Sequence, residues 1–429
     1  MSLSETVDAI AEHHSWADPV IVFVTGIFVL FSRRPDALLN PQFFIEDGAY
    51  WYAQAHEVGG FRALLVPSYR GYMHTVPRLG ALLVQPLPLR WAPFGMNLLA
   101  IAIAALPASF IVSRRFERVV PNLWVRLLIA FLYLAMPGAW TTMANMTHTQ
   151  WHFALLACLV VLAAPPVSTT GKILDVTITA LSGLTGPTAI FLIPIAALLW
   201  LLRRERWTLT LLGVTAATAV VEATTLLLTV AKSEGAPPLG ASWMSFIAIF
   251  VRRVVYGTLL GEAESRQLFA NASGFWLHPA TLLVAAAAAV ALMVFALLRS
   301  PLELRLLILF AMVIYVPSLC WPPEHLFSTE SYWQILADPG SSNRYFIIPI
   351  FTLLVSLVWL ASAGPALRRY VGMAALAAAV AIGVRLDWRE PPLRDYEFEQ
   401  FVAKYDRAQP GERVQFITPP GWSFVLTKR

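Results

Sequence analysis

Residues 281–298 read TLLVAAAAAVALMVFALL, a stretch in which every residue after the first threonine is apolar. A run of this length is sufficient for a membrane-spanning helix, which needs roughly 17–25 mostly apolar residues. A strand of a membrane barrel would instead alternate in polarity, because every second side chain faces the lumen. The stretch therefore predicts a helical membrane protein rather than a barrel.

The composition of the whole chain agrees with this prediction. Of 429 residues, 58% are hydrophobic and only 13% are charged, whereas soluble domains carry roughly 25% charged residues. A soluble protein of this length would need more charge to cover its surface, and a disordered chain would contain far fewer apolar residues. We therefore expect an all-α polytopic membrane protein.

Charge and cysteine content limit the classes of partner. In a membrane protein, basic residues usually set the topology, so the net charge of +5 predicts no nucleic-acid partner. Cys158 and Cys320 lie in or near apolar runs and indicate neither a disulfide framework nor a metal site. Residues 1–18 contain four acidic residues and no lysine or arginine, so we expect the first apolar stretch to be retained rather than cleaved as a signal peptide.

Apolar runs separated by short polar breaks predict about eleven membrane spans, within a membrane domain that covers residues 1–385. Small residues such as the alanines of 285–289 would allow such helices to pack closely. The predicted spans are residues 15–32, 93–113, 121–138, 150–166, 173–186, 188–202, 208–230, 278–298, 303–320, 345–362 and 370–385.

Basic residues in the short breaks predict the orientation of these spans. Positive charge in short loops marks the cytoplasmic side, and five breaks carry such charge. All five face the cytoplasm only if residues 173–202 cross twice, as two short helices that separate near residues 183–187; a single kinked helix is the alternative. The clusters are Arg114, Arg115 and Arg118; Lys172; Arg203, Arg204 and Arg206; Arg299 and Arg305; and Arg368 and Arg369.

The first span opposes this rule, because Arg33 and Arg34 follow it. We still place the N-terminus inside, since the next span has to end at the cluster that begins with Arg114. On this orientation the long polar segments gather outside: residues 33–92, 231–277, 321–344 and a short tail at 386–429. Polar material on one face is typical of an enzyme with an outer site, whereas a transporter usually shows two similar halves.

The tail, residues 386–429, predicts a small folded unit. We expect a short helix near residues 396–405, a short strand near 413–418, and a turn at 419–422 with Trp422 packed at the membrane interface. Because the tail is too small to build much core alone, it is expected to pack on the outer loops.

The first outer segment contains two adjacent carboxylates between aromatic clusters. Residues 40–52 read NPQFFIEDGAYWY, which places Glu46 and Asp47 between two phenylalanines and a Tyr-Trp-Tyr run. Aromatic residues are typical of the membrane interface, and an interfacial helix could begin near Asp47. One interpretation is that an acid caps this helix electrostatically. The other is chemical, because partial desolvation raises the basicity of a carboxylate and lets it take a proton from a hydroxyl.

In its order of elements the chain resembles the GT-C glycosyltransferases: one apolar span, a large outer segment that opens with an acidic pair, then many helices. These enzymes use polyprenyl-phosphate sugars and include protein O-mannosyltransferases, aminoarabinose transferases and oligosaccharyltransferases. Their first outer loop carries an acidic motif of the types DE, ED, DxD or ExD, and Glu46-Asp47 matches at that position. The resemblance implies a GT-C-like fold with Asp47 as catalytic base and Glu46 as its neighbour.

Basic residues in two outer segments are candidates for substrate binding. Arg70 and His74 either bind lipid head groups at the interface or line the donor or acceptor site. His148 and His152 share one helix face, but two ligands are too few for a closed zinc site. We expect His148 to donate a hydrogen bond to a phosphate or sugar, and His152 to be packed.

The segment before residue 345 is a further candidate binding region. Arg344 stands at the membrane boundary, where it either extends its charge to the interface or binds a phosphate through its planar guanidinium. GT-C enzymes place a basic residue near a late helix to hold the lipid phosphate, and the resemblance assigns this role to Arg344. His325, Asn343 and Tyr345 are additional substrate-binding candidates.

These residues predict an inverting membrane glycosyltransferase. A sugar would pass from a polyprenyl-phosphate donor to a hydroxyl of a glycan, lipid or protein acceptor, on the extracytoplasmic face of a bacterial-type inner membrane. We predict no metal site and no required cofactor, although the acidic motif could bind a divalent cation. The alternatives are a lipid-glycan flippase or transporter, and an O-antigen-type polymerase or ligase that uses a diphosphate donor and the arginines Arg252, Arg253 and Arg266.

Overall fold

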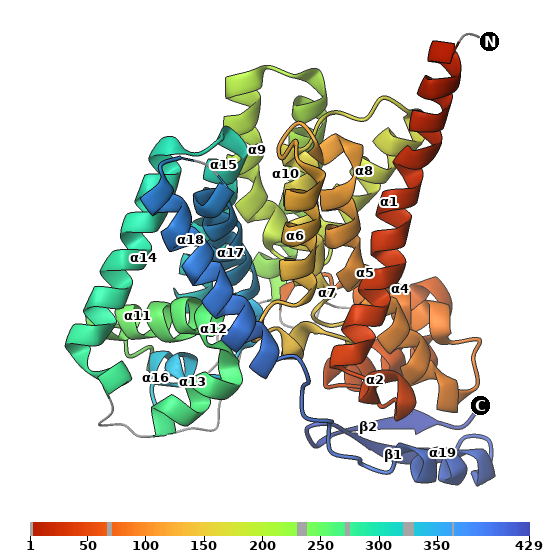
Figure 1. Ribbon diagram of the computed structural model, residues 1–429. Helices are drawn as coiled ribbons and strands as arrows, with labels where there is room; N and C mark the ends of the chain where they lie inside the picture. The colour runs from red at the N-terminus through yellow and green to blue at the C-terminus, as the bar shows by residue number, and fades with distance from the viewer. Residues whose placement is uncertain (1–2, 67–70, 230–237, 271–274, 321–329, 363) are drawn as a thin grey trace.

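The computed structural model describes residues 3–66, 71–229, 238–270, 275–320, 330–362 and 364–429. These residues form nineteen α-helices, short 3-10 or π-helical turns labelled η, and one two-stranded sheet. The long helices run side by side in a bundle (Figure 1). The helices that coincide with the predicted spans are α1 (Leu3–Arg33), α5 (Ala92–Val112), α6 (Leu123–Leu134), α7 (Thr149–Leu162), α8 (Thr169–Gly183), α9 (Thr188–Arg203), α10 (Arg206–Thr229), α14 (Pro279–Arg299), α15 (Leu302–Cys320), α17 (Ile347–Ser362) and α18 (Ala366–Ala378).

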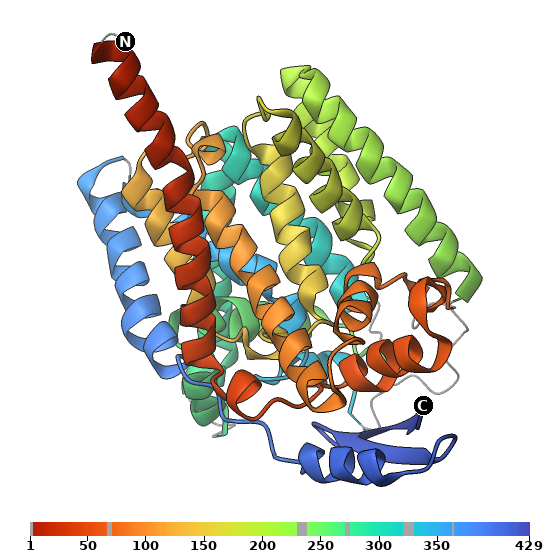
Figure 2. The same ribbon diagram turned by 90° about the vertical axis from the view of Figure 1, so that its right-hand side faces the viewer.

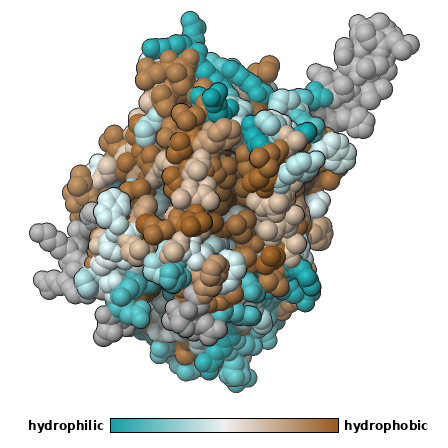
Figure 3. All heavy atoms as spheres, turned by 60° about the vertical axis from the view of Figure 1, so that its left-hand side comes forward, coloured by the Kyte–Doolittle hydropathy of each residue, from teal (hydrophilic) through white to brown (hydrophobic). Residues whose placement is uncertain are grey.

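Five helices are long and apolar enough to cross a membrane, as a multi-pass membrane protein requires: Leu89–Val112, Arg206–Leu228, Pro279–Arg299, Leu302–Cys320 and Ala366–Val384. Figure 3 shows that, on the face drawn, hydrophobic residues dominate the middle of the molecule and hydrophilic residues gather toward its two ends. Several of the other bundle helices are shorter, so the number of eleven spans stays a prediction.

Residues 173–202 form two helices, α8 and α9, rather than one kinked helix. The break between them contains Gly186, and a side chain at that position would lie 2.3 Å from Oε1 of Gln150 on α7. The glycine therefore lets the break approach α7 closely. Ser168 begins α8 in the usual way, because its hydroxyl accepts a hydrogen bond from the amide of Gly171.

Ion pairs between helix ends bring four of the predicted basic breaks together. We call this end of the bundle, with the α5–α6, α9–α10 and α14–α15 turns, the basic end. It is the end that the positive-inside rule places in the cytoplasm. The pairs are Arg115 with Asp175 at 2.6 Å, Arg118 with Glu205 at 2.8 Å, and Arg203 with Glu303.

The opposite end, which we call the outer end, carries the short elements and the C-terminal tail (Figures 1 and 2). Residues 231–277, predicted only as an outer segment, contain helices from Trp243 onward. The short elements are α2 (Asp36–Leu39), η1 (Asp47–Tyr52), α3 (Ala53–Val58), η2 (Gly60–Leu65), α4 (Thr75–Val84), α11 (Trp243–Ile249), η7 (Phe250–Tyr256), α12 (Gly257–Leu259), α13 (Gly261–Ala270), α16 (Tyr332–Ala337) and η9 (Asn343–Tyr345).

The tail folds into α19 (Phe398–Arg407) and a hairpin of β1 (Arg413–Thr418) and β2 (Trp422–Thr427). The predicted helix, strand and turn are confirmed, whereas the second strand was missed. The tail packs on the first outer segment, as expected: the ring of Phe43 lies 5.6 Å from that of Phe398 and 6.0 Å from that of Phe424. Trp422 contacts Tyr50, with ring centroids 6.2 Å apart.

Candidate functional site

The acidic pair lies in a strained turn that the tail supports. Ile45 has a φ of +46°, a left-handed conformation that is costly for a β-branched residue. Its amide donates a hydrogen bond to the carbonyl oxygen of Pro419 in the tail, at 3.0 Å. Directly after Glu46, residues Asp47–Tyr52 form a π-helical turn, η1, a rare geometry that often occurs at functional sites. Strain of this kind persists where surrounding contacts enforce it.

Asp47 is fully buried and accepts three hydrogen bonds. The amides of Met146 and Thr147 each donate to one carboxylate oxygen at 2.8 Å, and the Thr147 hydroxyl donates at 2.7 Å. Nε1 of Trp51 donates to that same hydroxyl at 2.8 Å. Burial raises the pKa of Asp47 to about 7, although these donors act in the opposite direction. In this conformation the Asp47 carboxylate joins the first outer segment to the turn before α7 and is closed to solvent.

Glu46 is half-buried, unlike its neighbour, and lies in a polar group around Tyr72. Burial raises the pKa of the Tyr72 phenol to about 12; the nearby Tyr345 and Glu46 act in the same direction and Arg344 in the opposite one. The Tyr72 hydroxyl also forms a hydrogen bond with the side chain of Gln150. Tyr72 therefore has an acidic residue from the first outer segment and a basic residue from the turn before α17 in its surroundings.

Arg344 and Tyr345 lie on η9, directly before α17. The Arg344 guanidinium carbon lies 4.7 Å from the centre of the Tyr345 ring, and Nη2 donates to the Tyr345 hydroxyl at 3.3 Å. The Tyr345 ring in turn packs edge-on against Trp151 of α7, with centroids 5.6 Å apart. The half-buried Arg344 is thus oriented by aromatic contacts while its charge acts on Tyr72 and His148.

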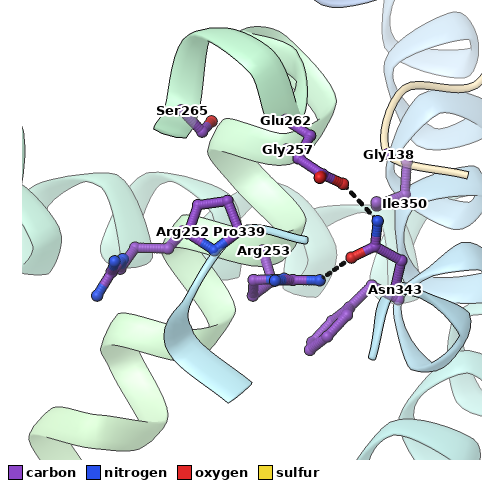
Figure 4. Close-up of a pocket in the computed structure, with 10 residues that line it drawn as sticks. Gly138, Arg252, Arg253, Gly257, Glu262, Ser265, Pro339, Asn343 and Ile350 are labelled. Carbon is purple, nitrogen blue, oxygen red and sulfur yellow. Dashed lines mark hydrogen bonds between the residues drawn. The ribbon is translucent and has the colours of Figure 1, made fainter. Parts of the chain in front are cut away.

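Asn343 points into a polar cluster with Arg253 and Glu262 (Figure 4). Its side-chain oxygen accepts a hydrogen bond from Arg253, and its amide donates to Glu262. The cavity there is only about 20 Å³, which suits about one water molecule rather than a substrate. Arg253 also donates to the carbonyl oxygens of Asp338 and Ser341. Asn343 therefore holds the turn that presents Arg344.

Arg252, Arg253 and Arg266 are the arginines that a polymerase or ligase with a diphosphate donor would use. Two of them contact residues of this cluster. Arg253 bonds to the 338–343 turn, and Arg266 forms an ion pair with Glu262. Arg252 lies with its guanidinium carbon 4.4 Å from the centre of the Phe269 ring. In this arrangement Arg253 and Arg266 support the outer turn instead of converging on one anion site.

His148 is buried directly before α7 and near Arg344. Burial and the charge of Arg344 lower its pKa to about 3, so the ring is neutral near pH 7. Nδ1 lies 2.5 Å from the carbonyl oxygen of Thr141, which can only accept, so Nδ1 carries the proton. Nε2 therefore offers a lone pair, and the expected donation from His148 to a phosphate does not fit this tautomer. Accepting a hydrogen bond from a hydroxyl does.

His74 and His152 are held in packed positions. The ring of His74 lies between Tyr72 and Trp51, with centroids 4.1 and 4.5 Å away. His152 contacts the Tyr133 hydroxyl at 2.6 Å and the Thr142 carbonyl oxygen at 3.0 Å, which agrees with its predicted packing. His74 thus orients the Tyr72 side of the site.

Residues with a left-handed backbone conformation occur in the segments that meet at this site. Among the described residues, six non-glycine residues have a positive φ, and four of them flank these segments: Ile45, His74, Ala144 and Ser342. Each such residue costs about 1–3 kcal/mol. Backbone strain therefore concentrates where the acidic turn, the Tyr72 segment, the turn before α7 and η9 come together.

The structure brings together four of the predicted site residues: Glu46, His148, Arg344 and Tyr345. Arg70 and His325 lie outside the described residues. Sequence reasoning missed the roles of Thr147, Gln150 and Tyr72, and no spacing pattern in the chain marks them. Within the described ranges, no group of three or more His, Cys, Asp or Glu residues is arranged to hold a metal ion.

Comparison of the chain with protein-family models, curated protein sequences and solved structures gives no match in any of the three.

Proposed function

We propose that this multi-pass membrane protein is an inverting glycosyltransferase of the GT-C type, with its site at the outer end. The observation that carries the proposal is that Glu46 and Arg344, far apart in the sequence, both act electrostatically on the same half-buried tyrosine, Tyr72. An acid and a cation near one another are what transfer from a phosphate-linked donor requires, since one accepts a proton and the other stabilises the leaving group.

Glu46 is the proton acceptor in this proposal. It takes the proton of an acceptor hydroxyl, whose oxygen then forms a bond to the anomeric carbon of a polyprenyl-phosphate sugar. The bond from that carbon to the phosphate oxygen breaks on the opposite side, and the phosphate leaves with the electron pair. Displacement in line inverts the anomeric configuration. The acceptor is a hydroxyl of a glycan, lipid or protein.

Arg344 stabilises the phosphate that leaves. A guanidinium presents planar paired donors that match phosphate oxygens, and its contacts with Tyr345 fix the plane of the Arg344 group. His148, neutral at pH 7, accepts a hydrogen bond from a sugar or acceptor hydroxyl through Nε2. A divalent cation would bind through Glu46 if the reaction uses one.

The roles of the two acids differ from those that the resemblance implies. Asp47 is fully buried and its two oxygens accept three internal hydrogen bonds, so a substrate hydroxyl has no access to it in this conformation. Glu46 is half-buried. We therefore assign Glu46 as the base and Asp47 as the positioning residue that holds the acidic turn.

The test is transfer of a labelled sugar from a polyprenyl-phosphate donor by purified, reconstituted protein. Glu46→Gln should lower the rate by about 10²–10⁴-fold at unchanged thermal stability, the usual contribution of a general base. Asp47→Asn should lower both, because the amide nitrogen that replaces one carboxylate oxygen cannot accept the hydrogen bond from Met146 or those from Thr147 that this oxygen received. Glu399→Gln, at an exposed position on α19, is the matched control and should retain full activity.

Two outcomes would count against the proposal. If the Glu46→Gln protein turns over at the wild-type rate while Asp47→Asn is folded and inactive, Asp47 is the base. If wild-type protein moves the intact lipid-linked sugar across a vesicle membrane and transfers none of it, the protein is a flippase.

A further inference from the structure

An apolar cavity lies at the basic end, away from the proposed active site. It has a volume of about 340 Å³, within the usual range of ligand pockets. Its walls come from α5, α6, α7, α15 and α17, through side chains such as Ile129, Leu159, Leu307, Phe351 and Val355. Its chemistry fits a hydrocarbon chain rather than a polar metabolite.

The cavity opens at the surface of the basic end. Pro121, Asn122 and Pro301 line it and are exposed to solvent. Asn122 belongs to the α5–α6 turn and Pro301 to the α14–α15 turn, two of the turns that define this end. Trp124, next to the opening, is 78% exposed, as is typical of a residue at the level of the lipid head groups. The opening therefore lies where a membrane lipid has its head group.

A buried arginine, Arg126, lies on α6 between the wall residues Val125 and Ile129, although it does not itself line the cavity. Arg126 lies one helical turn after Asn122 on α6 and is only 5% exposed. Its Nε and Nη1 form no hydrogen bond with any described residue. A buried guanidinium without a partner is costly, and such residues within membrane helices normally pair with an anion.

The arginines that adjoin the cavity wall outnumber Glu303, the charged residue that the wall itself carries. Glu303 lines the cavity, but Arg203 neutralises it in an ion pair. Arg368 lies over Trp359, a wall residue, with its guanidinium carbon 4.0 Å from the ring centre. Its Nε also lacks a partner among the described residues. Charge complementarity thus favours an anionic amphiphile over a zwitterionic one.

We infer that this cavity binds an anionic phospholipid of the membrane leaflet at the basic end, with one acyl chain between α6, α7, α15 and α17 and the phosphate beside Arg126. The inference rests on the cavity and its arginines and does not depend on the proposed glycosyltransferase activity. Basic pockets between membrane helices on the cytoplasmic side commonly recognise such head groups.

The test uses the full chain purified in detergent and titrated with phosphatidylglycerol or phosphatidylcholine of identical acyl chains, followed by native mass spectrometry. We expect phosphatidylglycerol to bind with at least about tenfold higher affinity, the scale of one hydrogen bond to a charged group. Arg126→Gln should remove this preference, and Val355→Trp should prevent binding by filling the cavity. Arg299→Gln removes an equal charge from an exposed position at the same end and should change nothing.

Photo-crosslinking keeps the inference testable if Arg126→Gln does not fold. Wild-type protein treated with phosphatidylglycerol that carries a diazirine on its acyl chain should be labelled within residues 119–129 and 351–359. Labels spread over the outer helix surfaces, equal binding of the two lipids, or equal losses in Arg126→Gln and Arg299→Gln would each overturn it. Displacement by polyprenyl phosphate at lower concentration than phosphatidylglycerol would identify a different ligand and overturn it as well.

Discussion

At the basic end, Arg115, Arg118 and Arg203 each face a carboxylate on another part of the bundle, over short turns. At the outer end, the charged residues lie in long segments with left-handed residues, and Asp47 is bound by backbone amides rather than by a cation. Similar charged residues thus serve two purposes in the molecule. Complementary pairs join helices at the basic end, whereas at the outer end backbone amides and a hydroxyl hold the buried carboxylate of Asp47.

Among the changes that compare the basic residues of the two ends, the largest effect should come from removing the cation of the outer end. Arg344→Gln is expected to lower sugar transfer by about 10²–10³-fold, since it removes stabilisation of the leaving phosphate. Arg344→Lys should recover part of the rate, because the charge stays while the planar fork is lost. Transfer kinetics measure this. Arg369→Gln, an exposed arginine of the basic end, should be neutral, and equal losses in both would mean that only net charge matters.

The next effect concerns stability at the basic end. Asp175 is nearly fully buried and accepts both guanidinium nitrogens of Arg115, at 2.6 and 2.7 Å, and Nε1 of Trp207 at 3.1 Å. Asp175→Asn should destabilise the fold by about 3 kcal/mol, the low end for a buried ion pair, because it leaves the half-buried Arg115 without its carboxylate. Thermal unfolding in detergent would show it. The rate of sugar transfer per folded molecule should not change. A loss of transfer without a loss of stability would contradict the idea that the basic end serves stability and the outer end serves catalysis.

A pH dependence should separate Asp47 from the rest of the outer end. Its pKa is raised to about 7 from an ordinary value of 3.8, so the folded state favours the neutral acid. The stability that this preference contributes is present below about pH 4 and is lost as the pH rises through 7. Wild-type protein should therefore lose thermal stability relative to Asp47→Asn between pH 5 and 8. A constant difference over this range would indicate that Asp47 stays ionised.

The smallest effect should come from the exposed pair at the basic end. The side chain of Arg118 is 44% exposed and that of Glu205 24%, so water and salt weaken their attraction. Arg118→Gln should change the free energy of unfolding by less than about 1 kcal/mol. Thermal unfolding at low and high salt measures it, and a loss as large as that of Asp175→Asn would show that exposure does not rank these pairs.

Much of the bundle could be predicted from the sequence because long apolar runs have one stable arrangement in lipid. The two helices within residues 173–202 followed from the glycines and Pro187 between them, and the tail helix from the pattern after Tyr396. Helix α11 and its continuation η7 were missed, because Arg252 and Arg253 interrupt an otherwise apolar run. The strand Trp422–Thr427 was missed because its partner strand, not its own sequence alone, stabilises it.

The candidate site was less predictable for a physical reason. The sequence marks both Glu46 and Asp47 as adjacent acids, but only tertiary contacts decide which one is buried. The amides of Met146 and Thr147 select Asp47, and no local pattern reveals that choice. Likewise the tautomer of His148 depends on the carbonyl of Thr141. Residue types could be predicted, whereas hydrogen-bond direction could not.

The contact between Ile45 and Pro419 has a consequence for how the protein matures. The acidic turn is synthesised before its supporting carbonyl, which lies several hundred residues later in the sequence. Gly48, in the same turn, packs closely against Phe424 of β2: a Cβ atom at position 48 would lie 2.9 Å from the Phe424 ring. The packing of the acidic turn therefore depends on β2 as well. The nascent chain thus cannot complete the turn until translation has passed both Pro419 and Phe424, so the acidic turn reaches its final form only after the bundle helices have been made.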